Sequence, residues 1–205
     1  MAPVILSQTH RIGRSFRAGS LLSLLVTALP TVVAAQFTSP QLGVAAGAAL
    51  PVAGPGTAWY LQGGWPVGWQ GMALVALRIG RSPLGVRMDG SYSVTTSNAP
   101  INGAMTAQKI QLQGWDADVT FTTPGPTRVK VYLLAGPGLY NTTWTYTQQH
   151  QITTYHYREK LGYNLGGGLT LGALFFEARY VHVDGLGGVS LPLVPVTAGL
   201  RFGER

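Results

Sequence analysis

The chain has 205 residues, the length of one domain or of one domain with a tail, and only 10% of them are charged. Soluble proteins carry about a quarter charged residues. Yet the mean hydropathy is only +0.19, and no apolar run reaches the roughly 18–20 residues of a membrane helix. With 28 glycines and no cysteine, the composition excludes a disulfide-stapled domain and disfavours an ordinary soluble enzyme. It suits a transmembrane β-barrel, in which apolar and polar residues alternate along each strand.

The first 35 residues have the three parts of a secretory signal peptide. Arginines precede an apolar stretch over 21–35, which ends in the small residues Ala34 and Ala35. We expect 1–35 to be cleaved and 36–205 to form the barrel domain. The net charge then falls from +7 to +4, because three of the 14 basic residues and no acidic residue are removed. No basic cluster remains, so nucleic acid is not an expected partner.

Strands are predicted along the whole remaining chain. Prolines recur at short intervals, so long helices do not fit between them. The predicted strands are 40–51, 68–79, 84–95, 108–121, 127–141, 160–171, 174–184 and 194–203. The connections alternate between short ones, at 80–83, 123–126 and 172–173, and longer ones, at 52–67, 96–107, 142–159 and 185–193. This order predicts an all-β, eight-stranded, antiparallel up-and-down barrel with short turns at one end.

Apolar and polar residues alternate within the strands, which predicts that the two faces of the sheet lie in different environments. In the last strand, for example, Val196, Ala198 and Leu200 oppose Thr197 and Arg201. The fourth strand changes phase, because its apolar residues are even-numbered up to 112 and odd-numbered from 115. Gly114 lies at the change, where we expect a β-bulge.

The polar faces decide which side of the barrel is inside. Their nine charged residues are four acids and five bases, a near balance that suits a lumen better than a solvated surface. Eight strands enclose a lumen that side chains can fill. The predicted lumen network consists of Arg87, Asp89, Asp116, Asp118, Arg128, Lys130, Glu177, Arg179 and Arg201. The alternative is a soluble lipocalin-like barrel with its apolar face inward around an apolar ligand.

Three segments resemble the OmpA/OmpX-like superfamily of small outer-membrane β-barrels. They are Phe175–Tyr180, Val194–Phe202 and Val131–Gly138. The resemblance implies location in the outer membrane, contact with its lipid, and insertion by the outer-membrane assembly machinery. That machinery reads an aromatic residue in the last strand, which would be Phe202, although Gly203-Glu204-Arg205 follow it. Members of the superfamily tether, adhere, defend or pass small molecules, and few are enzymes.

Enzymatic activity is not expected. Lipid A deacylases of this barrel type use a histidine two residues before a serine on a late strand, but His182 is followed by Asp184. We interpret His182 as a residue of the outer membrane interface. Palmitoyltransferase barrels have an amphipathic helix at the N-terminus, and none is predicted over 36–40.

No cofactor or metal is predicted. His150 and His156 are six residues apart in one connection without a third ligand nearby. The sequon at Asn141-Thr142-Thr143 is interpreted as a chance match.

Aromatic residues in the longer connections form the predicted interaction surface for glycans or proteins. They are Trp59, Tyr60, Trp144, Tyr146, Tyr155 and Tyr157. Both arms of 142–159 favour β structure, so this connection is expected to extend the fifth and sixth strands as a hairpin. The competing interpretation is the aromatic girdle of the membrane interface, to which we assign Trp69 and Tyr140.

The sequence therefore predicts an outer-membrane barrel with a role in envelope integrity or in contact with an extracellular partner. A narrow channel for small or hydrophobic solutes is one alternative, and the soluble ligand-binding barrel is another. Because the chain stops after its last strand, we expect no peptidoglycan-binding domain.

Overall fold

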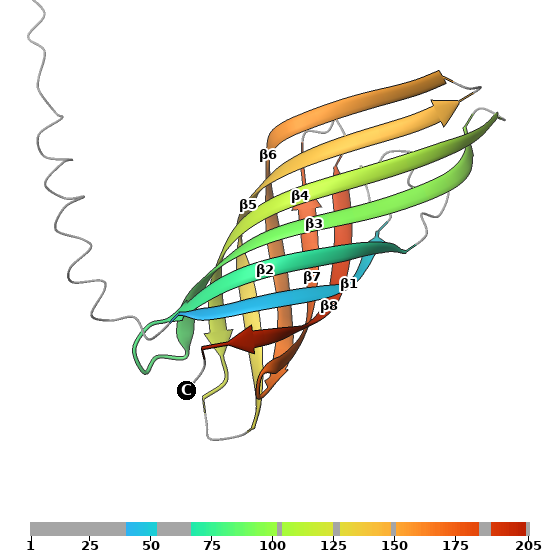
Figure 1. Cartoon of the computed structure of the whole chain (residues 1–205). Coiled ribbons are helices and arrows are strands. Elements are labelled where there is room, and N and C mark those ends of the chain that lie inside the picture. Colours follow the sequence, from blue (N-terminus) through green and yellow to red (C-terminus); the bar gives the residue numbers. More distant parts are fainter. Residues whose placement is uncertain are drawn as a thin grey trace, which may run out of the picture. The chain divides into compact units, whose positions relative to one another are not determined.

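The computed structural model describes residues 40–52, 67–101, 104–124, 128–148, 151–184 and 190–203, which form one closed barrel (Figure 1). Each strand pairs antiparallel with its neighbours in sequence, and the first pairs with the last. The strands are β1 (Gln41–Pro51), β2 (Gly68–Arg78), β3 (Leu84–Ile101), β4 (Ala104–Thr122), β5 (Val129–Gln148), β6 (Gln151–Leu171), β7 (Leu174–Val183) and β8 (Leu191–Phe202). The predicted eight-stranded architecture is confirmed. The expected signal peptide lies outside the described residues.

No helix among the described residues is long and apolar enough to cross a membrane.

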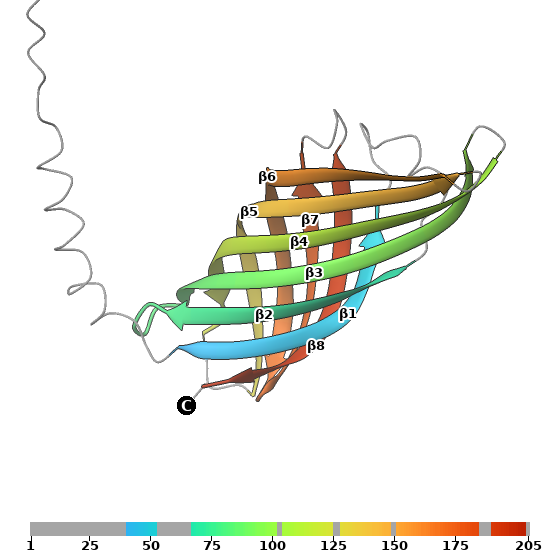
Figure 2. The ribbon, with the colours of Figure 1, turned by 45° about the horizontal axis from the view of Figure 1, so that its top comes forward.

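The central strands are much longer than the others. β3 to β6 have 18 to 21 residues, whereas the remaining strands have 10 to 12. Pairing between β2 and β3 begins at Trp69 and Val94, and pairing between β6 and β7 begins at Gly162 and Val183. Beyond these pairs, β3 to β6 continue as a sheet that we call the four-stranded extension (Figures 1 and 2).

The extension corrects one predicted connection and confirms another. The segment 96–107 was expected to be a long loop, but β3 runs to Ile101 and β4 begins at Ala104. Its Thr, Ser and Asn residues do not produce the alternation of apolar and polar residues by which a strand is recognised in a sequence. The segment 142–159 forms the expected hairpin of β5 and β6. We call this end of the barrel the long-hairpin end.

Two of the predicted tight connections, 80–83 and 172–173, lie at the opposite, short-turn end, whereas residues 125 and 126 of the third lie outside the described residues. Gly80 and Gly172 adopt positive φ angles of 53° and 59° there. Residues with a Cβ rarely adopt this left-handed conformation, which explains glycine at both turns.

Side chains sort cleanly between the two faces of the barrel. On β5, Leu133 is 60% exposed on the outside, whereas its neighbour Leu134 is 2% exposed on the inside. Other exposed apolar residues of the outer face are Leu42, Val75, Met88, Trp115, Val119, Val131, Leu165, Leu169, Phe176, Val196, Leu200 and Phe202. This apolar band surrounds a lumen that contains buried charges, as expected for a transmembrane barrel. A lipocalin-like barrel would have the opposite arrangement.

The expected β-bulge at Gly114 is wrong. Even-numbered residues of β4 are buried continuously from 108 to 118, and the β3–β4 register is unbroken. The change of phase in the sequence has a different origin. The inner face of β4 is apolar at Ile110 and Leu112, towards the long-hairpin end, and polar at Asp116 and Asp118, towards the short-turn end.

A bulge occurs instead on β6, opposite β5 between Tyr140 and Thr142. Glu159 has a φ of 53° at this point, and its backbone N–H donates to Oδ1 of Asn141 at 3.0 Å. One extra residue on β6 changes which residues face inward, so that odd-numbered residues of β6 share the inner face above the bulge.

The interior of the barrel is layered. An apolar cluster fills the long-hairpin end, formed by Ile110, Leu112, Tyr140, Val181, Val183, Leu191 and Leu193. A second cluster is formed by Met72, Leu74, Ala76 and Phe175. Along β7, the charged Glu177 and Arg179 lie between Phe175 of the second cluster and Val181 of the first.

Candidate functional site

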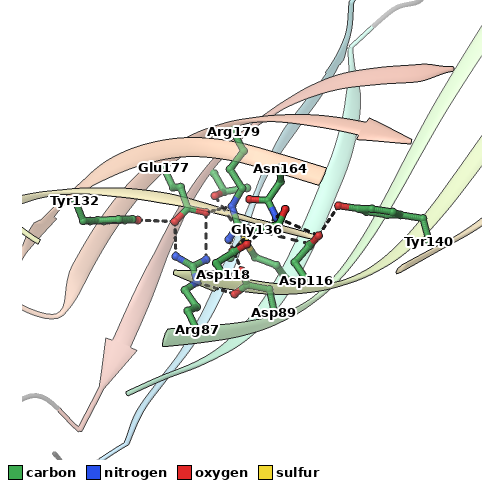
Figure 3. A network of polar contacts seen from close by, with 12 residues as sticks. Arg87, Asp89, Asp116, Asp118, Tyr132, Gly136, Tyr140, Asn164, Glu177 and Arg179 are labelled. Carbon is green, nitrogen blue, oxygen red and sulfur yellow. Dashed lines mark hydrogen bonds and ion pairs between the residues drawn. The ribbon is translucent and has the colours of Figure 1, made fainter. Parts of the chain in front are cut away.

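Two arginines and two acids form a closed ring across the middle of the lumen (Figure 3). Arg87 and Asp89 are on β3, and Glu177 and Arg179 are on β7. Because side chains two residues apart on a strand share a face, each strand contributes one positive and one negative group. We call these four residues the charge ring.

Every neighbouring pair in the charge ring is in contact. Arg87 Nη1 lies 2.5 Å from Glu177 Oε2, and Arg87 Nε lies 2.7 Å from Asp89 Oδ1. Arg179 Nη2 lies 2.6 Å from Asp89 Oδ2, and Arg179 Nε donates to Glu177. All four residues are at most 5% exposed. Charges this deeply buried need such pairing, because desolvation of an unpaired ion is costly.

Two further carboxylates from β4 lie against the ring. Arg179 Nη1 lies 3.5 Å from Asp118 Oδ2 and 4.0 Å from Asp116 Oδ2. The amide of Asn164, on β6, donates to Asp118 at 2.7 Å and to Asp116 at 3.3 Å. The Asn164 side chain therefore bridges two neighbouring carboxylates and offsets their mutual repulsion by supplying a donor to both.

Two tyrosines of β5 complete the network from either side. Tyr132 donates to Glu177 Oε2 at 2.6 Å, and Tyr140 donates to Asp116. The ring of Tyr140 lies against Gly114, Gly138 and Gly162 on three neighbouring strands. A Cβ at any of the three would come within 2.7 Å of this ring, so the glycines make room for it.

The network contains more acid than base. Its four carboxylates and two guanidiniums sum to a formal charge of −2. Two of the basic residues predicted for the lumen lie nearer the short-turn end. Lys130 is half-buried, and the guanidinium carbon of Arg201 lies 5.2 Å from the ring centroids of Tyr132 and Phe175. These cations offset the excess negative charge of the lumen.

Six of the nine predicted lumen residues are thus brought together, and three are not. Lys130 and Arg201 flank the network, whereas Arg128 is exposed just before β5 begins. Sequence reasoning missed Asn164, Tyr132 and Tyr140 as members. All three are even-numbered, like the other inward-facing residues in these parts of β5 and β6. This alternation is the sequence feature that could have assigned them to the lumen.

In the part of the chain that the structure describes, the two cavities beside the network are too small for a substrate. A cavity of about 30 Å³ lies on the short-turn side, lined by residues that include Arg78, Arg87 and Lys130. Another, of about 10 Å³, lies on the long-hairpin side between Asp89, Asp116 and Leu112. A water molecule needs roughly 10–15 Å³ of such space, so these cavities accommodate only one or two waters.

The aromatic residues predicted for the surface of the β5–β6 hairpin form a continuous stack. Trp144 and Tyr155 face each other across the two strands with ring centroids 5.8 Å apart. Tyr146 lies 6.0 Å from Tyr155, and Tyr157 lies 6.4 Å from it, both in stacked arrangements. We call these four residues the aromatic ladder. Trp59 and Tyr60 lie outside the described residues.

The ladder faces inward, on the side that continues the lumen. Thr142 pairs with Tyr157, and Trp144 and Tyr157 pack against the apolar cluster of the long-hairpin end. Hydrogen bonds from Thr153 and from Tyr155 lower the pKa of Tyr146, and the bond to Tyr146 raises the pKa of Tyr155. The rings thus share both stacking and hydroxyl contacts.

The two residues assigned to the membrane girdle differ in outcome. Trp69 is 54% exposed on the outer face, and its ring lies 5.6 Å from that of Tyr92. Tyr140 is 1% exposed inside the lumen, so its assignment was wrong. Tyr140 is one of the even-numbered residues of β5, which face the lumen, and its hydroxyl group donates a hydrogen bond to Asp116.

His182 lies on the outer face near the long-hairpin end. Its ring stacks on Tyr163 at 5.1 Å and lies 6.2 Å from Tyr180. Its Nε2 lies 2.9 Å from Oδ1 of Asp184, the residue that stands where a deacylase would have serine. Phe202 is also on the outer face, 54% exposed, and pairs with Leu42 where the barrel closes.

Within the described ranges, no group of three or more His, Cys, Asp or Glu residues is arranged to hold a metal ion. His156 is exposed, and its Nδ1 lies 3.2 Å from Oγ1 of Thr143. His150 lies outside the described residues.

Comparison with solved structures finds other small barrels. Neisserial surface protein A is 16% identical, with a TM-score of 0.53 over 80% of this chain and 97% of that one. The Ail protein of Yersinia pestis is 17% identical, covering 82% of this chain and 99% of that one, with a TM-score of 0.44. The N-terminal barrel domain of Pseudomonas aeruginosa OprF is 13% identical, with coverages of 79% and 97% and a TM-score of 0.43. The closed eight-stranded barrel and the match to Neisserial surface protein A show that the chain has the fold of the small outer-membrane β-barrels.

No family model matches the sequence. No curated protein matches it either.

Proposed function

We propose that this chain is a non-enzymatic outer-membrane barrel that acts at the cell surface through its four-stranded extension. The observation that carries the proposal is the contrast between the two halves of the molecule. Paired charges and two apolar clusters fill the barrel, whereas the extension continues past the last pairs of β2 with β3 and of β6 with β7. The barrel serves as an anchor and the extension as the part that meets partners.

The filled lumen supports anchoring over transport. A solute path would have to separate Arg87 from Glu177 and Arg179 from Asp89, which would break both contacts of the charge ring across the lumen and leave only the pairs within each strand. The narrow-channel alternative therefore has little structural support.

The outer face supports a location in the membrane. Its exposed Leu, Val, Phe and Met side chains would contact lipid, and Trp69 and Tyr92 would lie at an interface. Phe202, on the last strand, is the residue we propose for recognition by the assembly machinery. The long-hairpin end would then face outward from the cell, since outer-membrane barrels have short periplasmic turns.

Among the described residues, the hydroxyl group beside His182 is that of Tyr180, 3.3 Å from Nδ1, and not the serine of a deacylase, which supports a non-enzymatic role. Its imidazole is already engaged by Asp184 and by the rings of Tyr163 and Tyr180. A deacylase of this barrel type would need a serine hydroxyl within hydrogen-bond reach of this ring.

The proposal is tested by expressing the full chain with an epitope inserted between Gln148 and Gln151. We expect the protein in the outer-membrane fraction, faster migration before boiling than after, and antibody labelling of the epitope on intact cells. Planar bilayers containing the purified barrel should show no step conductance. Recovery in the soluble fraction, an epitope that antibody cannot reach, or steady conductance through the wild-type barrel would each overturn the proposal.

A further inference from the structure

We propose that the inner face of the β5–β6 hairpin binds an uncharged glycan, stacked on the aromatic ladder. The inference rests on the proposed function, because it needs the hairpin to be exposed at the cell surface. It assigns a ligand class to the ladder and roles to two of its residues, Trp144 and Tyr155.

The geometry of the ladder is that of a stacking platform. Tyr146, Tyr155 and Tyr157 follow one another with centroid separations of 6.0 and 6.4 Å and interplanar angles of 24° and 22°. Trp144 adds a fourth ring, tilted by 34° to Tyr155. A row of nearly parallel rings offers repeated negative π faces, to which the C–H groups on the apolar face of a sugar ring are attracted.

The rings remain available to a ligand. Tyr155, at the centre of the ladder, is 43% exposed, and the other three rings are half-buried. A core cluster would bury such rings almost completely. Tyr and Trp also contribute large rigid contact areas at low cost in side-chain entropy, which is why binding surfaces use them.

Charge selects the class of ligand. The segments 141–148 and 151–157 contain no Asp, Glu, Lys or Arg, but they contain six threonines in addition to the aromatic residues. Arg158 follows Tyr157 with its side chain in the next position of the pleat, on the other side of the strand. A sulfated glycan or a single-stranded nucleic acid would require cations along the platform, so the surface suits a ligand that is rich in hydroxyls and uncharged.

The same inner face has unused hydrogen-bonding capacity. Gln108 pairs with Tyr146 in the β4–β5 register and is 3% exposed. Within the described part of the chain, neither polar atom of its side-chain amide has a hydrogen-bond partner, and the Thr142 hydroxyl has none either. Buried polar groups are normally satisfied. Gln108 and Thr142 are covered in this structure, at 3% and 2% exposure, so water would complete them, or hydroxyl groups of a ligand once the covering side chains move aside.

The β6 bulge is what places the ladder on one face. Tyr155 and Tyr157 are odd-numbered, whereas Trp144 and Tyr146 are even-numbered on the facing strand. The extra residue at Glu159 brings both pairs to the inner side. The bulge thus produces a continuous row of rings from two strands.

The test uses the mature chain in lipid nanodiscs and three hexasaccharides. Two are neutral, of β-linked N-acetylglucosamine and of β-linked glucose, and the third is a sulfated heparin fragment. We expect calorimetry to detect binding of at least one neutral sugar, unchanged when the salt concentration is raised tenfold. Trp144→Ala and Tyr155→Ala should weaken binding at least tenfold, and Tyr155→Phe, which keeps the ring, should preserve it.

His156→Ala is the matched control, because His156 alternates with Tyr155 and Tyr157 and lies on the outer side of the same strand. It should leave binding unchanged. All variants must retain the mobility shift between unheated and boiled samples, which separates loss of binding from loss of the barrel. The inference is overturned if neither neutral sugar binds, if only the sulfated one binds, or if His156→Ala costs as much as Tyr155→Ala.

The outcome is separable from that of the proposed function. A hairpin that antibody reaches on intact cells but that binds no neutral sugar overturns only the glycan inference. A hairpin epitope that is inaccessible overturns the surface role itself, whatever the purified protein binds.

Discussion

Arg87 and Glu177 join opposite walls of the barrel through paired hydrogen bonds of 2.5 and 3.2 Å. They are 90 residues apart in sequence and belong to β3 and β7, which lie half a turn apart in a ring of eight strands. Arg179 and Asp89 make the reciprocal connection between the same two strands. The centre of the barrel is therefore tied across its diameter as well as around its circumference.

Removing one charge of this tie should be costly. Glu177→Gln leaves the guanidinium groups of Arg87 and Arg179 facing a neutral amide, and we expect the free energy of unfolding to fall by about 3–5 kcal/mol. Urea unfolding of the refolded barrel in detergent would measure it. Arg128→Gln, which removes an exposed charge, should change the same free energy by less than about 0.5 kcal/mol. Equal effects of the two variants would contradict the buried role of Glu177.

Asn164 should be required as a donor rather than as a filler. Asn164→Asp places a third carboxylate beside Asp116 and Asp118 and should destabilise the barrel by several kcal/mol, since like charges then meet in a desolvated site. Adding Asp118→Asn to this variant restores one amide and removes one negative charge. It should therefore recover part of the lost free energy of unfolding. Unfolding curves for the single and double variants decide the point, and additive losses would rule out the direct contact.

The glycines around Tyr140 should not tolerate a methyl group. At Gly162, a Cβ would lie 2.2 Å from the carbonyl oxygen of His182 and 2.7 Å from the Tyr140 ring. We expect Gly162→Ala to lower the unfolding free energy by about 1–3 kcal/mol, as overpacking does. Gly71 is the control, because its nearest contact would be 4.0 Å away, and Gly71→Ala should be neutral or slightly stabilising.

The outer apolar band should reject charge, whereas the extension should accept it. Leu133→Arg is expected to cost about 2–4 kcal/mol if Leu133 lies near the bilayer midplane, as for other barrels. Thr96→Arg changes an exposed residue of β3 beyond its last pair with β2 and should cost almost nothing. Both are measured by reversible unfolding in lipid vesicles. A tolerated arginine at position 133 would place that face in water.

The β6 bulge should prefer glycine. Glu159 has a positive φ, which costs an L-residue roughly 1–2 kcal/mol. Glu159→Gly should therefore slow amide hydrogen exchange in residues 151–160, and Glu159→Val should accelerate it because a β-branched residue fits this conformation poorly. The same exchange rates in both variants would mean that the bulge is not strained.

The sequence predicted the fold and most of the lumen, because both depend on local alternation. Arg87 and Asp89 could be assigned to the inside from the parity of one strand alone. Their partners on β7 could not be deduced, since which strands face each other across a lumen depends on how the whole sheet curls. Tyr140 was assigned to the interface because tyrosine is common there, and no pattern showed that three glycines on neighbouring strands leave room for its ring inside.

The false bulge at Gly114 has the same origin. Pattern reading takes apolar residues to share one face, and β4 breaks this assumption because its inner side passes from an apolar cluster to a charged network. The bulge that the structure does contain lies at Glu159. Glutamate is an ordinary surface residue, so nothing in the sequence indicated a bulge there.

The charge ring also bears on how the barrel assembles. β3 and β7 meet across the lumen only when the sheet has curled far enough for β1 to reach β8. A sheet that entered the lipid while still open would expose two guanidinium groups and four carboxylates to hydrocarbon, so half-closed forms are strongly disfavoured. Pairing of β1 with β8 and pairing of the charged groups across the lumen therefore occur as a single cooperative event, which forms the last step of insertion.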